Sequence, residues 1–357
     1  MAEKLLDVQN LCVSFDTRQG IVRAVRDVSF HVEKGEILGF VGESGSGKSA
    51  SVMSCLGLMA RNGRVENGSI RFEDRELSPV GLKTRSERKR HEAMLQDIRG
   101  NEISMIFQDP MTYMNPVLTI GTQVTEGILA HTQCSRRQAT QKGIELLRMV
   151  GISSPEHRMK QYPYEFSGGM RQRIIIAIAL ACSPKLLIAD EPTTALDVTV
   201  QAQILELIRQ RARQEGTSVI MITHDLGVVA SLCDRIAILY GGKIVETGTT
   251  DEIFYETKHP YTLGLLGSIA RRQAQRDGTF IREEIHSIPG TPPDLLKINA
   301  GCPFVNRCPE AMRICKDYLP ATVDFSHSHS ACCWKFCREQ AAALVAEQDR
   351  KRGEANG

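Results

Sequence analysis

A glycine-rich segment near the N-terminus constrains the fold of this chain more than any other feature. Residues 42–49 read Gly-Glu-Ser-Gly-Ser-Gly-Lys-Ser and fit the phosphate-binding pattern G-x-x-x-x-G-K-S/T. The apolar run 36–41 predicts a short buried strand before this loop, and residues 50–58 predict a helix after it. A helix N-terminus and inward-turned backbone N–H groups both attract phosphate. The segment therefore predicts an α/β nucleotide-binding core rather than a chance Gly/Ser turn.

Side chains within this P-loop, residues 42–49, have separate expected roles. Lys48 is expected to reach the outer phosphates of the nucleotide, and the Ser49 hydroxyl is expected to ligate Mg²⁺. The residues of the loop that are expected to bind ATP are Gly42, Ser44, Gly45, Ser46, Gly47, Lys48 and Ser49.

Two adjacent acids end a second apolar run. The run 185–190 lacks the alternation of a half-exposed strand and is typical of a parallel strand covered on both faces. Asp190 at its end is expected to hold Mg²⁺, directly or through water, and Glu191 is expected to polarise the attacking water. Two neighbouring carboxylates are costly to bury without a cation or a partner, which favours these roles over acids in an ordinary turn.

The segment Ser167-Gly168-Gly169-Met170-Arg171-Gln172 opens an apolar helix expected at 174–182. Together with the P-loop, Gln108, Asp190-Glu191 and His224, it stands in the order found in ABC-type ATP-binding subunits, which this chain resembles over its whole core. The resemblance implies a head-to-tail pair of subunits, with ATP between the P-loop of one and the Ser-Gly-Gly segment of the other. The residues that it assigns to the partner's ATP are Ser167, Gly168, Gly169 and Gln172.

The same resemblance gives roles to residues between these motifs. Gln108 would lie at the ATP site, would contact Mg²⁺ or the attacking water, and would report the nucleotide state to the segment that begins at Asp109. His224 would contact the γ-phosphate and help to position the water. Asp197 would lie across the dimer interface. Phe15 is expected to stack on adenine, with a core aromatic as the alternative.

Hydrophobic patterns divide the first part of the chain into a sheet and a helical block. A mixed-sheet ATPase domain is expected over residues 1–250, with a helical subdomain at about 117–184. Helices are predicted at 122–131, 135–150 and 198–214, and strands at 11–15, 25–32, 218–223, 235–240 and 243–245. Acids interleave with the basic residues of 78–101, which favours a solvated helix face over a phosphate-binding patch.

Composition changes beyond about residue 250 and predicts a small irregular, cysteine-rich extension over 251–357. A short helix is predicted at 259–270, whereas the Pro-rich run 288–293 is unsuited to regular structure. This region resembles the C-terminal extension of the oligopeptide/dipeptide branch of importer ATPases. Tyr113 and Met114 stand where that branch is expected to carry a Ser-Leu pair, on the surface expected to touch membrane subunits.

Six of the eleven cysteines lie between Cys302 and Cys337. Disulfides are rare in cytosolic proteins, so this group points to metal ligation. Four thiolates suit a [4Fe–4S] cluster or a tetrahedral zinc ion, and spacing alone does not separate them. The family resemblance favours the cluster within a site at 302–337. Its implied ligands are Cys302, Cys308, Cys315 and Cys332. Cys333, His327 and His329 remain alternative ligands, and a metal-free tail remains an alternative to both.

Composition also limits where the chain works. The net charge of +2 gives no reason to invoke nucleic acid as a partner. No apolar run approaches the ~20 residues of a membrane span, and acids interrupt the first residues, so no secretory signal is predicted. The chain is therefore expected to be cytosolic. The resemblance to importer ATPases implies that it lies on the cytoplasmic face of the cell (inner) membrane, as a peripheral protein held by membrane subunits.

The motifs and the extension together predict the ATP-hydrolysing subunit of an ABC importer for di- or oligopeptides. Its expected partners are a second, related ABC ATPase, two polytopic permease subunits and an extracytoplasmic solute-binding protein. Nickel, opines or other small solutes remain alternative cargoes, and a soluble non-transport ABC ATPase is the alternative class. The single cassette and the absence of a long coiled-coil insertion in the sequence argue against that class.

Overall fold

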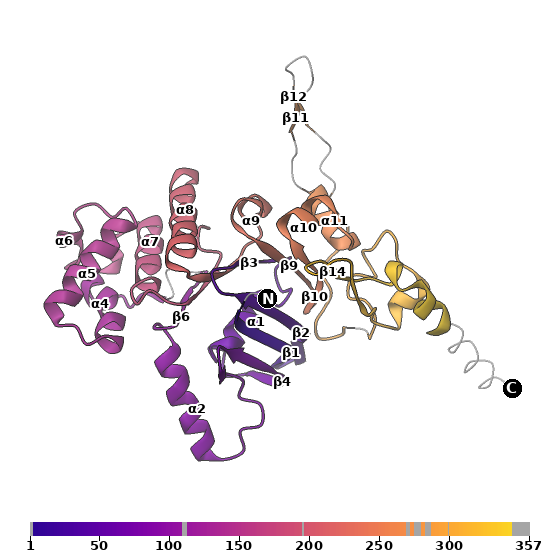
Figure 1. The fold of residues 1–357 in the computed structure, drawn as a ribbon, viewed down its shortest axis with the longest axis horizontal. Helices are drawn as coiled ribbons and strands as arrows, with labels where there is room; N and C mark the ends of the chain where they lie inside the picture. The colour runs from indigo at the N-terminus through magenta and orange to yellow at the C-terminus, as the bar shows by residue number, and fades with distance from the viewer. Residues whose placement is uncertain are drawn as a thin grey trace.

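The computed structural model describes residues 3–108, 113–194, 196–268, 272–274, 280–282, 287–298 and 300–344. Its centre is an eight-stranded mixed sheet in the order β13-β14-β10-β9-β3-β8-β7-β6 (Figure 1). The strands are β3 (Ile37–Val41), β6 (Ile103–Ile106), β7 (Leu186–Asp190), β8 (Ser218–Ile222), β9 (Arg235–Tyr240), β10 (Lys243–Thr249), β13 (Thr322–Asp324) and β14 (Ser330–Cys332). The five strands from β9 to β6 run parallel, and β10, β14 and β13 continue the sheet antiparallel.

The middle strands of this sheet are buried on both faces. Every residue of β3, β7 and β8 is buried. In β3, Ile37 and Val41 belong to one hydrophobic cluster, whereas Leu38 and Phe40 belong to the other. Successive side chains of a strand point to opposite faces, so the two clusters meet across the sheet. The prediction that unbroken apolar runs form central parallel strands is confirmed.

A four-stranded antiparallel sheet lies beneath the central sheet in Figure 1. Its strands are β1 (Lys4–Thr17), β2 (Gly20–Glu33), β4 (Gly63–Phe72) and β5 (Arg75–Glu76). Helix α1 (Lys48–Cys55) contacts β1 and β2. The first strand is longer than the predicted 11–15, because its pairing with β2 shifts register at several places and interrupts the alternation that the prediction used.

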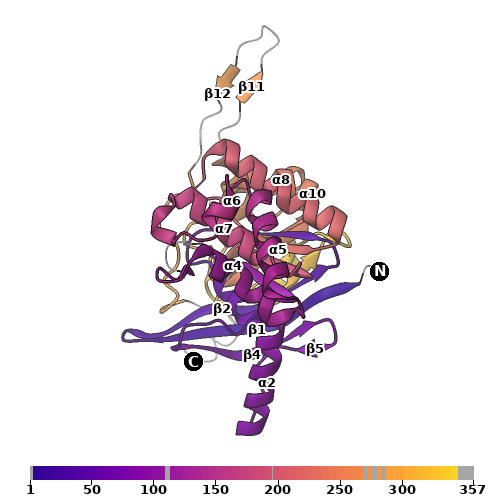
Figure 2. The same ribbon diagram turned by 90° about the vertical axis from the view of Figure 1, so that its left-hand side faces the viewer.

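Helices cover the opposite face of the central sheet. α7 (Gly168–Ala179), α8 (Val198–Glu215) and α9 (Leu226–Leu232) lie along it. α4 (Ile120–His131) and α5 (Arg136–Met149) pack against α7, and α6 (Pro155–Arg158) contacts α5. Figure 2 looks onto these helices, with the antiparallel sheet below them. Helix α2 (Arg85–Ile98) projects downward and buries only Leu95 and Ile98, as expected of a solvated helix.

The C-terminal region is more regular than the irregular extension that the sequence predicts, because two of its segments join the central sheet. α10 (Thr250–Tyr255) and α11 (Pro260–Gly267) follow β10, β11 (Arg272–Ala274) pairs with β12 (Phe280–Arg282), and β14 pairs with β10. The buried Glu246 carboxylate of β10 holds this region in place. It contacts His329 Nε2 at 2.9 Å and accepts hydrogen bonds from the N–H groups of Lys258 and His259. Strands of three residues are too short to produce an alternating pattern, so the sequence did not predict them.

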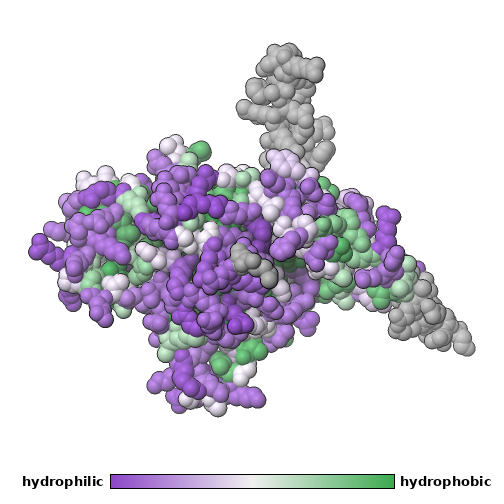
Figure 3. Space-filling model, viewed as in Figure 1, coloured by the Kyte–Doolittle hydropathy of each residue, from purple (hydrophilic) through white to green (hydrophobic). Residues whose placement is uncertain are grey.

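The face of the molecule in Figure 3 is mostly hydrophilic. On the face in Figure 3, apolar residues gather in patches over the helical block and the C-terminal region. Among the described residues, none of the helices is both long and apolar enough to span a bilayer.

An ion-pair network joins the N-terminal ends of β6 and β7, the strands that lead to Gln108 and Asp190. Arg75 donates two hydrogen bonds to Glu102, at 2.6 and 2.7 Å, and Lys185 Nζ lies 2.8 Å from the same carboxylate. The backbone carbonyl of Glu102 accepts from the N–H groups of Lys185 and Leu186. The hydrogen bonds from Arg75, with a further contribution from Lys185, lower the pKa of Glu102 to about 2.

We predict that Glu102→Gln lowers the free energy of unfolding at pH 7 by about 1 kcal/mol, since it removes a bidentate, partly buried pair. The folded-state pKa lies below the ordinary value, so the stabilisation is present above about pH 4.5. It is lost as the pH falls toward 2. Urea unfolding from pH 7 down to pH 3 measures this difference. Glu206→Gln, which breaks the exposed pair with Arg209, is the control. An equal effect of both variants at every pH would contradict the prediction.

Candidate functional site

The P-loop connects β3 to α1, and its glycines adopt backbone conformations that other residues avoid. Gly42, Gly45 and Gly47 have φ values of 157°, 75° and 101°. A Cβ atom at Gly42 would overlap the carbonyl oxygen of Leu239, and one at Gly47 would lie 2.5 Å from that of Ala24. The close approach of these backbones therefore requires glycine at both positions, and it fixes the loop in front of the N-terminus of α1.

Lys48 is the first residue of α1, and its side chain turns back into the loop. Its Nζ donates to the carbonyls of Gly42 (2.7 Å) and Glu43 (2.9 Å) and to Ser46 Oγ (3.3 Å). Burial lowers the pKa of Lys48, and the carboxylates of Asp190, Glu191 and Glu43 act against this shift. A cation is thus held at the position where the phosphate-binding pattern requires one.

Asp190 ends β7 and lies beside Ser49. Burial raises the pKa of this carboxyl group, and a hydrogen bond with Ser49 opposes the shift. The two residues come from different motifs, yet the structure brings their oxygens together near the P-loop. Carboxylate and hydroxyl oxygens are ligands that Mg²⁺ accepts beside phosphate oxygens.

Glu191 is held between two other predicted site residues. Its Oε2 accepts a hydrogen bond from Gln108 Nε2 at 3.2 Å, and its Oε1 lies 3.0 Å from His224 Nδ1. Gln108, Glu191 and His224 follow β6, β7 and β8, so the carboxyl ends of three neighbouring parallel strands supply them. His224 is 69% exposed, whereas Glu191 is 15% exposed. The carboxylate is therefore oriented from both sides at the edge of solvent.

Glu191 has a φ of 47°, which is in the left-handed region. Its N–H donates to the carbonyl of Ile222 at 2.9 Å, which fixes the backbone against β8. A non-glycine residue in this conformation is costly and persists only where the surroundings enforce it. The strain accompanies the placement of its side chain between Gln108 and His224.

The Ser-Gly-Gly segment lies at the N-terminus of α7. Ser167 caps this helix by accepting a hydrogen bond from Met170 N, and Ser167 and Gly168 are exposed. Gln172 differs from the expectation of a partner contact, because it is buried and its Nε2 donates to the carbonyl of Pro192 at 2.7 Å. The glutamine thus joins α7 to the loop that follows Glu191 in the same chain.

The other predicted site residues are more scattered. Asp197 is exposed and caps α8 by accepting from Val200 N at 3.0 Å. Phe15, on β1, is half-buried and packs against the second hydrophobic cluster, so its ring is shared between core and surface. The segment Asp109–Thr112, to which Gln108 was expected to report, lies outside the described residues.

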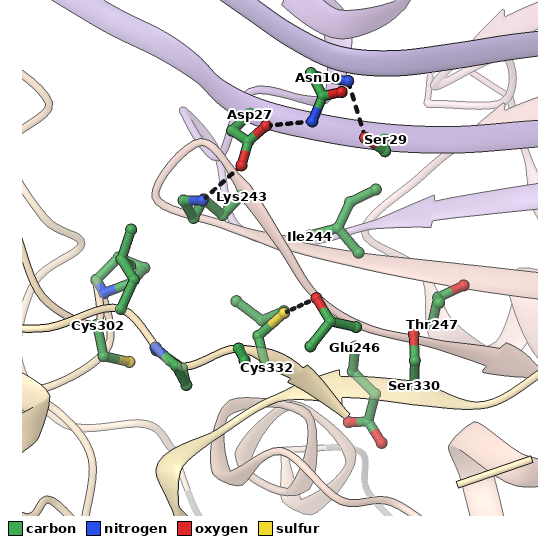
Figure 4. Close-up of a pocket in the computed structure, with 16 residues that line it drawn as sticks. Asn10, Asp27, Ser29, Lys243, Ile244, Glu246, Thr247, Cys302, Ser330 and Cys332 are labelled. Carbon is green, nitrogen blue, oxygen red and sulfur yellow. Dashed lines mark hydrogen bonds and ion pairs between the residues drawn. The ribbon is translucent and has the colours of Figure 1, made fainter. Parts of the chain in front are cut away.

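Cys332 has different neighbours from the other predicted metal ligands. The thiols of Cys302, Cys308, Cys315 and Cys333 are close enough for their charges to interact. Cys332 Sγ lies 3.2 Å from Thr322 Oγ1. It lines, with Cys302, a cavity of about 440 Å³ where the C-terminal region meets β2 and β10 (Figure 4). Over the described ranges, no group of three or more His, Cys, Asp or Glu side chains is arranged to hold a metal ion.

Sequence reasoning missed two residues that contact the P-loop. The Tyr261 hydroxyl accepts a hydrogen bond from Glu43 N at 3.0 Å, and Arg307 pairs with the Glu43 carboxylate at 2.7 Å. Glu43 occupies a variable position of the phosphate-binding pattern, so the motif gives no signal for it. The only sequence signal was the extension itself, whose contact with the core could not be inferred from composition.

Two family models match this chain. Residues 25–194 match the ABC transporter family, and residues 245–315 match the family described as oligopeptide/dipeptide transporter, C-terminal region. The dimeric structure of MJ0796, a bacterial ABC transporter cassette, aligns with 69% of this chain and 98% of its own. That alignment has a TM-score of 0.59 and 25% identity. The fold and the site therefore define an ABC-type ATPase.

Several relatives narrow the class. The dipeptide transport ATP-binding protein DppD of Bacillus subtilis is 50% identical over 333 residues, which are 93% of this chain and 95% of that protein. The oligopeptide transport ATP-binding protein OppD of Escherichia coli is 46% identical over 334 residues, which are 94% of each. This chain belongs to the ATP-binding subunits of the ABC transporter family, in its oligopeptide/dipeptide branch.

We predict that Lys48→Ala weakens ATP binding by roughly 10- to 100-fold, because it removes a charged hydrogen-bond donor from the loop. The dissociation constant of a fluorescent ATP analogue, measured with the full chain, tests this. Lys34→Ala, which breaks a surface pair with Glu3, is the control and leaves the affinity unchanged. Equal affinities for Lys48→Ala and wild type would contradict the assignment of Lys48 to phosphate binding.

Proposed function

We propose that this chain is the ATP-hydrolysing subunit of an importer for dipeptides or oligopeptides. The observation that carries the hydrolytic role is the Glu191 carboxylate held between Gln108 and His224 beside Lys48. The cargo class is supported by the relatives, whose names describe dipeptide and oligopeptide transport. The match of residues 245–315 to the C-terminal region of such transporters gives the same indication.

The proposed chemistry assigns each group a separate task. The P-loop N–H groups and Lys48 bind the phosphates, and Ser49, Gln108 and Asp190 supply oxygens for Mg²⁺. Mg²⁺, when bound, neutralises charge on the phosphates. Glu191 accepts a proton from the attacking water or orients it, and His224 orients Glu191 and approaches the γ-phosphate.

A second ATPase chain, which we propose is a related paralogue, completes the site. The composition of the assembled pair distinguishes a paralogue from an identical copy. Ser167 and Gly168 are exposed at the N-terminus of α7, where a helix end favours a phosphate from another subunit. Val198, next to Asp197, is 84% exposed, as a residue that awaits a partner surface would be. The MJ0796 cassette, which shares the fold, is described as dimeric.

Membrane subunits are the remaining partners in this proposal. An apolar groove of about 230 Å³ opens beside Phe107 and is lined largely by apolar residues of β6, of α7 and of the segment that follows α1. Tyr113 is 49% exposed at this groove, and its ring stacks on Phe107 with centroids 3.9 Å apart. Gln108 directly follows Phe107, so a permease helix in the groove would lie next to the ATP site. An extracytoplasmic binding protein would then deliver the peptide, and this chain would stay on the cytoplasmic face of the inner membrane.

We predict that Glu191→Gln lowers ATP hydrolysis at least about 100-fold while ATP binding changes little, because the amide keeps the shape but cannot accept the proton. The assay uses proteoliposomes that hold the complete transporter with its binding protein. It measures ATP hydrolysis and uptake of a labelled dipeptide and a labelled oligopeptide. Substantial hydrolysis by Glu191→Gln would reject its role. Uptake of nickel or an opine in place of either peptide would reject the proposed cargo.

We also propose that the cysteine-rich region binds a metal centre. A [4Fe–4S] cluster is the proposed centre, and a zinc ion is the alternative. Cys302, Cys308 and Cys315 are the named thiolates, and the proximity of Cys333 favours it over Cys332 as the fourth. The N–H of Cys302 donates to the carbonyl of Cys315 at 2.8 Å, which brings two of the ligand segments together. The described residues do not form a ligand set as they stand, so the thiols would have to close around the metal. The metal would cross-link the short segments of this region to one another.

The adjacent cysteines provide a matched pair of variants for this proposal. We predict that anaerobically purified wild type contains about four irons per chain and absorbs visible light. Cys333→Ser loses the iron, whereas Cys332→Ser retains it. One zinc per colourless chain would replace the cluster by zinc, and loss of metal only from Cys332→Ser would return the fourth ligand to Cys332. Metal-free wild type would reject the site.

A further inference from the structure

An ion pair links the C-terminal region directly to the P-loop. Arg307 Nη1 and Nη2 donate to the two carboxylate oxygens of Glu43 at 2.7 and 3.0 Å. The two residues are 264 positions apart in the sequence. The Arg307 side chain is 7% exposed and that of Glu43 is 24% exposed, so the pair is partly shielded from solvent. A bidentate pair with this geometry fixes both the distance and the orientation of the two groups.

Further contacts fix the guanidinium of Arg307. Its Nε donates to the carbonyl of Pro289 at 2.8 Å, Nη2 donates to that of Ile288 at 3.3 Å, and Nη1 donates to the Tyr240 hydroxyl at 3.0 Å. The hydrogen bonds with Glu43 and Tyr240 raise the pKa of Arg307, so its charge is permanent. The contacts with Pro289, Ile288 and Tyr240 therefore orient the planar guanidinium independently of Glu43. A lysine could not reproduce this set of contacts.

A second contact from the C-terminal region holds the backbone of the same loop residue. Glu43 N donates to the Tyr261 hydroxyl at 3.0 Å. Tyr261 is fully buried, and its ring contacts those of Tyr240 and Phe304, with centroids 4.4 and 5.3 Å apart. Because this N–H is already bonded, it is not free to bind a phosphate. We call Arg307, Tyr240 and Tyr261 the P-loop clamp.

The clamp acts on the charge next to the phosphate site. The carbonyl of Glu43 accepts a hydrogen bond from Lys48 Nζ at 2.9 Å, and the Glu43 carboxylate interacts with the charge of Lys48. Without Arg307, this carboxylate would be an uncompensated negative charge at the entrance of a site that must accept the polyphosphate of ATP. Like charges at such distances disfavour binding, and a partly buried carboxylate without a partner would also displace the loop.

We propose that Arg307 is a positioning residue for ATP binding, which neutralises Glu43 and keeps the P-loop and Lys48 in the geometry that accepts the phosphates. The inference rests on the proposed function, and it adds a role for the C-terminal region at the ATP site. Arg307 itself need not touch ATP.

The test compares ATP dissociation constants and melting temperatures of full-length variants, with a fluorescent ATP analogue as the probe. Arg307→Ala raises the dissociation constant roughly tenfold or more, because the Glu43 charge is left unpaired. Arg307→Lys gives an intermediate value, since it keeps the charge without the bidentate geometry. Lys335→Ala breaks the exposed pair with Glu310 in the same region and leaves the affinity unchanged.

The double variant Glu43→Gln/Arg307→Ala separates charge compensation from a purely structural contact. Removal of the unpaired carboxylate restores affinity to within about threefold of Glu43→Gln alone, even where the melting temperature stays low. A double variant as weak as Arg307→Ala would overturn the proposal, as would an Arg307→Ala protein with wild-type affinity. Wild type that fails to bind ATP would reject the ATP site itself, so the two failures are distinguishable.

Discussion

The site depends on one constraint, which is that β6, β7, β8 and β3 run parallel in a single sheet. Parallel strands place their carboxyl ends on the same edge, and ligands of such sheets bind beyond that edge. Burial of β3, β7 and β8 on both faces fixes their register. The P-loop, Asp190-Glu191 and His224 therefore meet although long stretches of sequence separate them. Any change that shifts one strand by a residue would separate groups whose hydrogen bonds are about 3 Å long.

The electrostatics of this edge are unusual for a site that receives an anion. Asp190, Glu191 and Glu43 surround a single buried lysine, and each of their charges acts on Lys48. Counted together with the guanidinium of Arg307, which pairs with Glu43, the three carboxylates outnumber the two cationic side chains before any ligand enters. Each acid has a partner of its own: Ser49 for Asp190, Gln108 and His224 for Glu191, and Arg307 for Glu43. The proposed Mg²⁺ would add the remaining positive charge where the phosphates bind.

Sequence patterns predicted the parts of the site that are local and failed for those that depend on distant contacts. The P-loop, the strand that ends at Asp190 and the helix behind Ser167 each form within a short segment, so their residues carry the signal. Gln172 was expected to face a partner, but its side chain turns inward to Pro192 because α7 packs against the sheet. Cys332 and Cys333 are adjacent and point to different neighbours, which spacing does not resolve. Neither Glu43 nor Arg307 stands in a periodic pattern or a motif that would predict their pairing.

That pairing also has a consequence for synthesis of the chain. Ribosomes extend proteins at about 5–20 residues per second, so residue 307 emerges roughly 13 to 50 s after residue 43. Throughout this interval, the nascent ATPase core has its glycine loop but lacks Arg307, the residue that neutralises Glu43. The nucleotide site therefore reaches its final form only after residue 307 has been made. Products truncated before residue 307 would contain the complete P-loop motif, but the Glu43 carboxylate would lack its arginine partner.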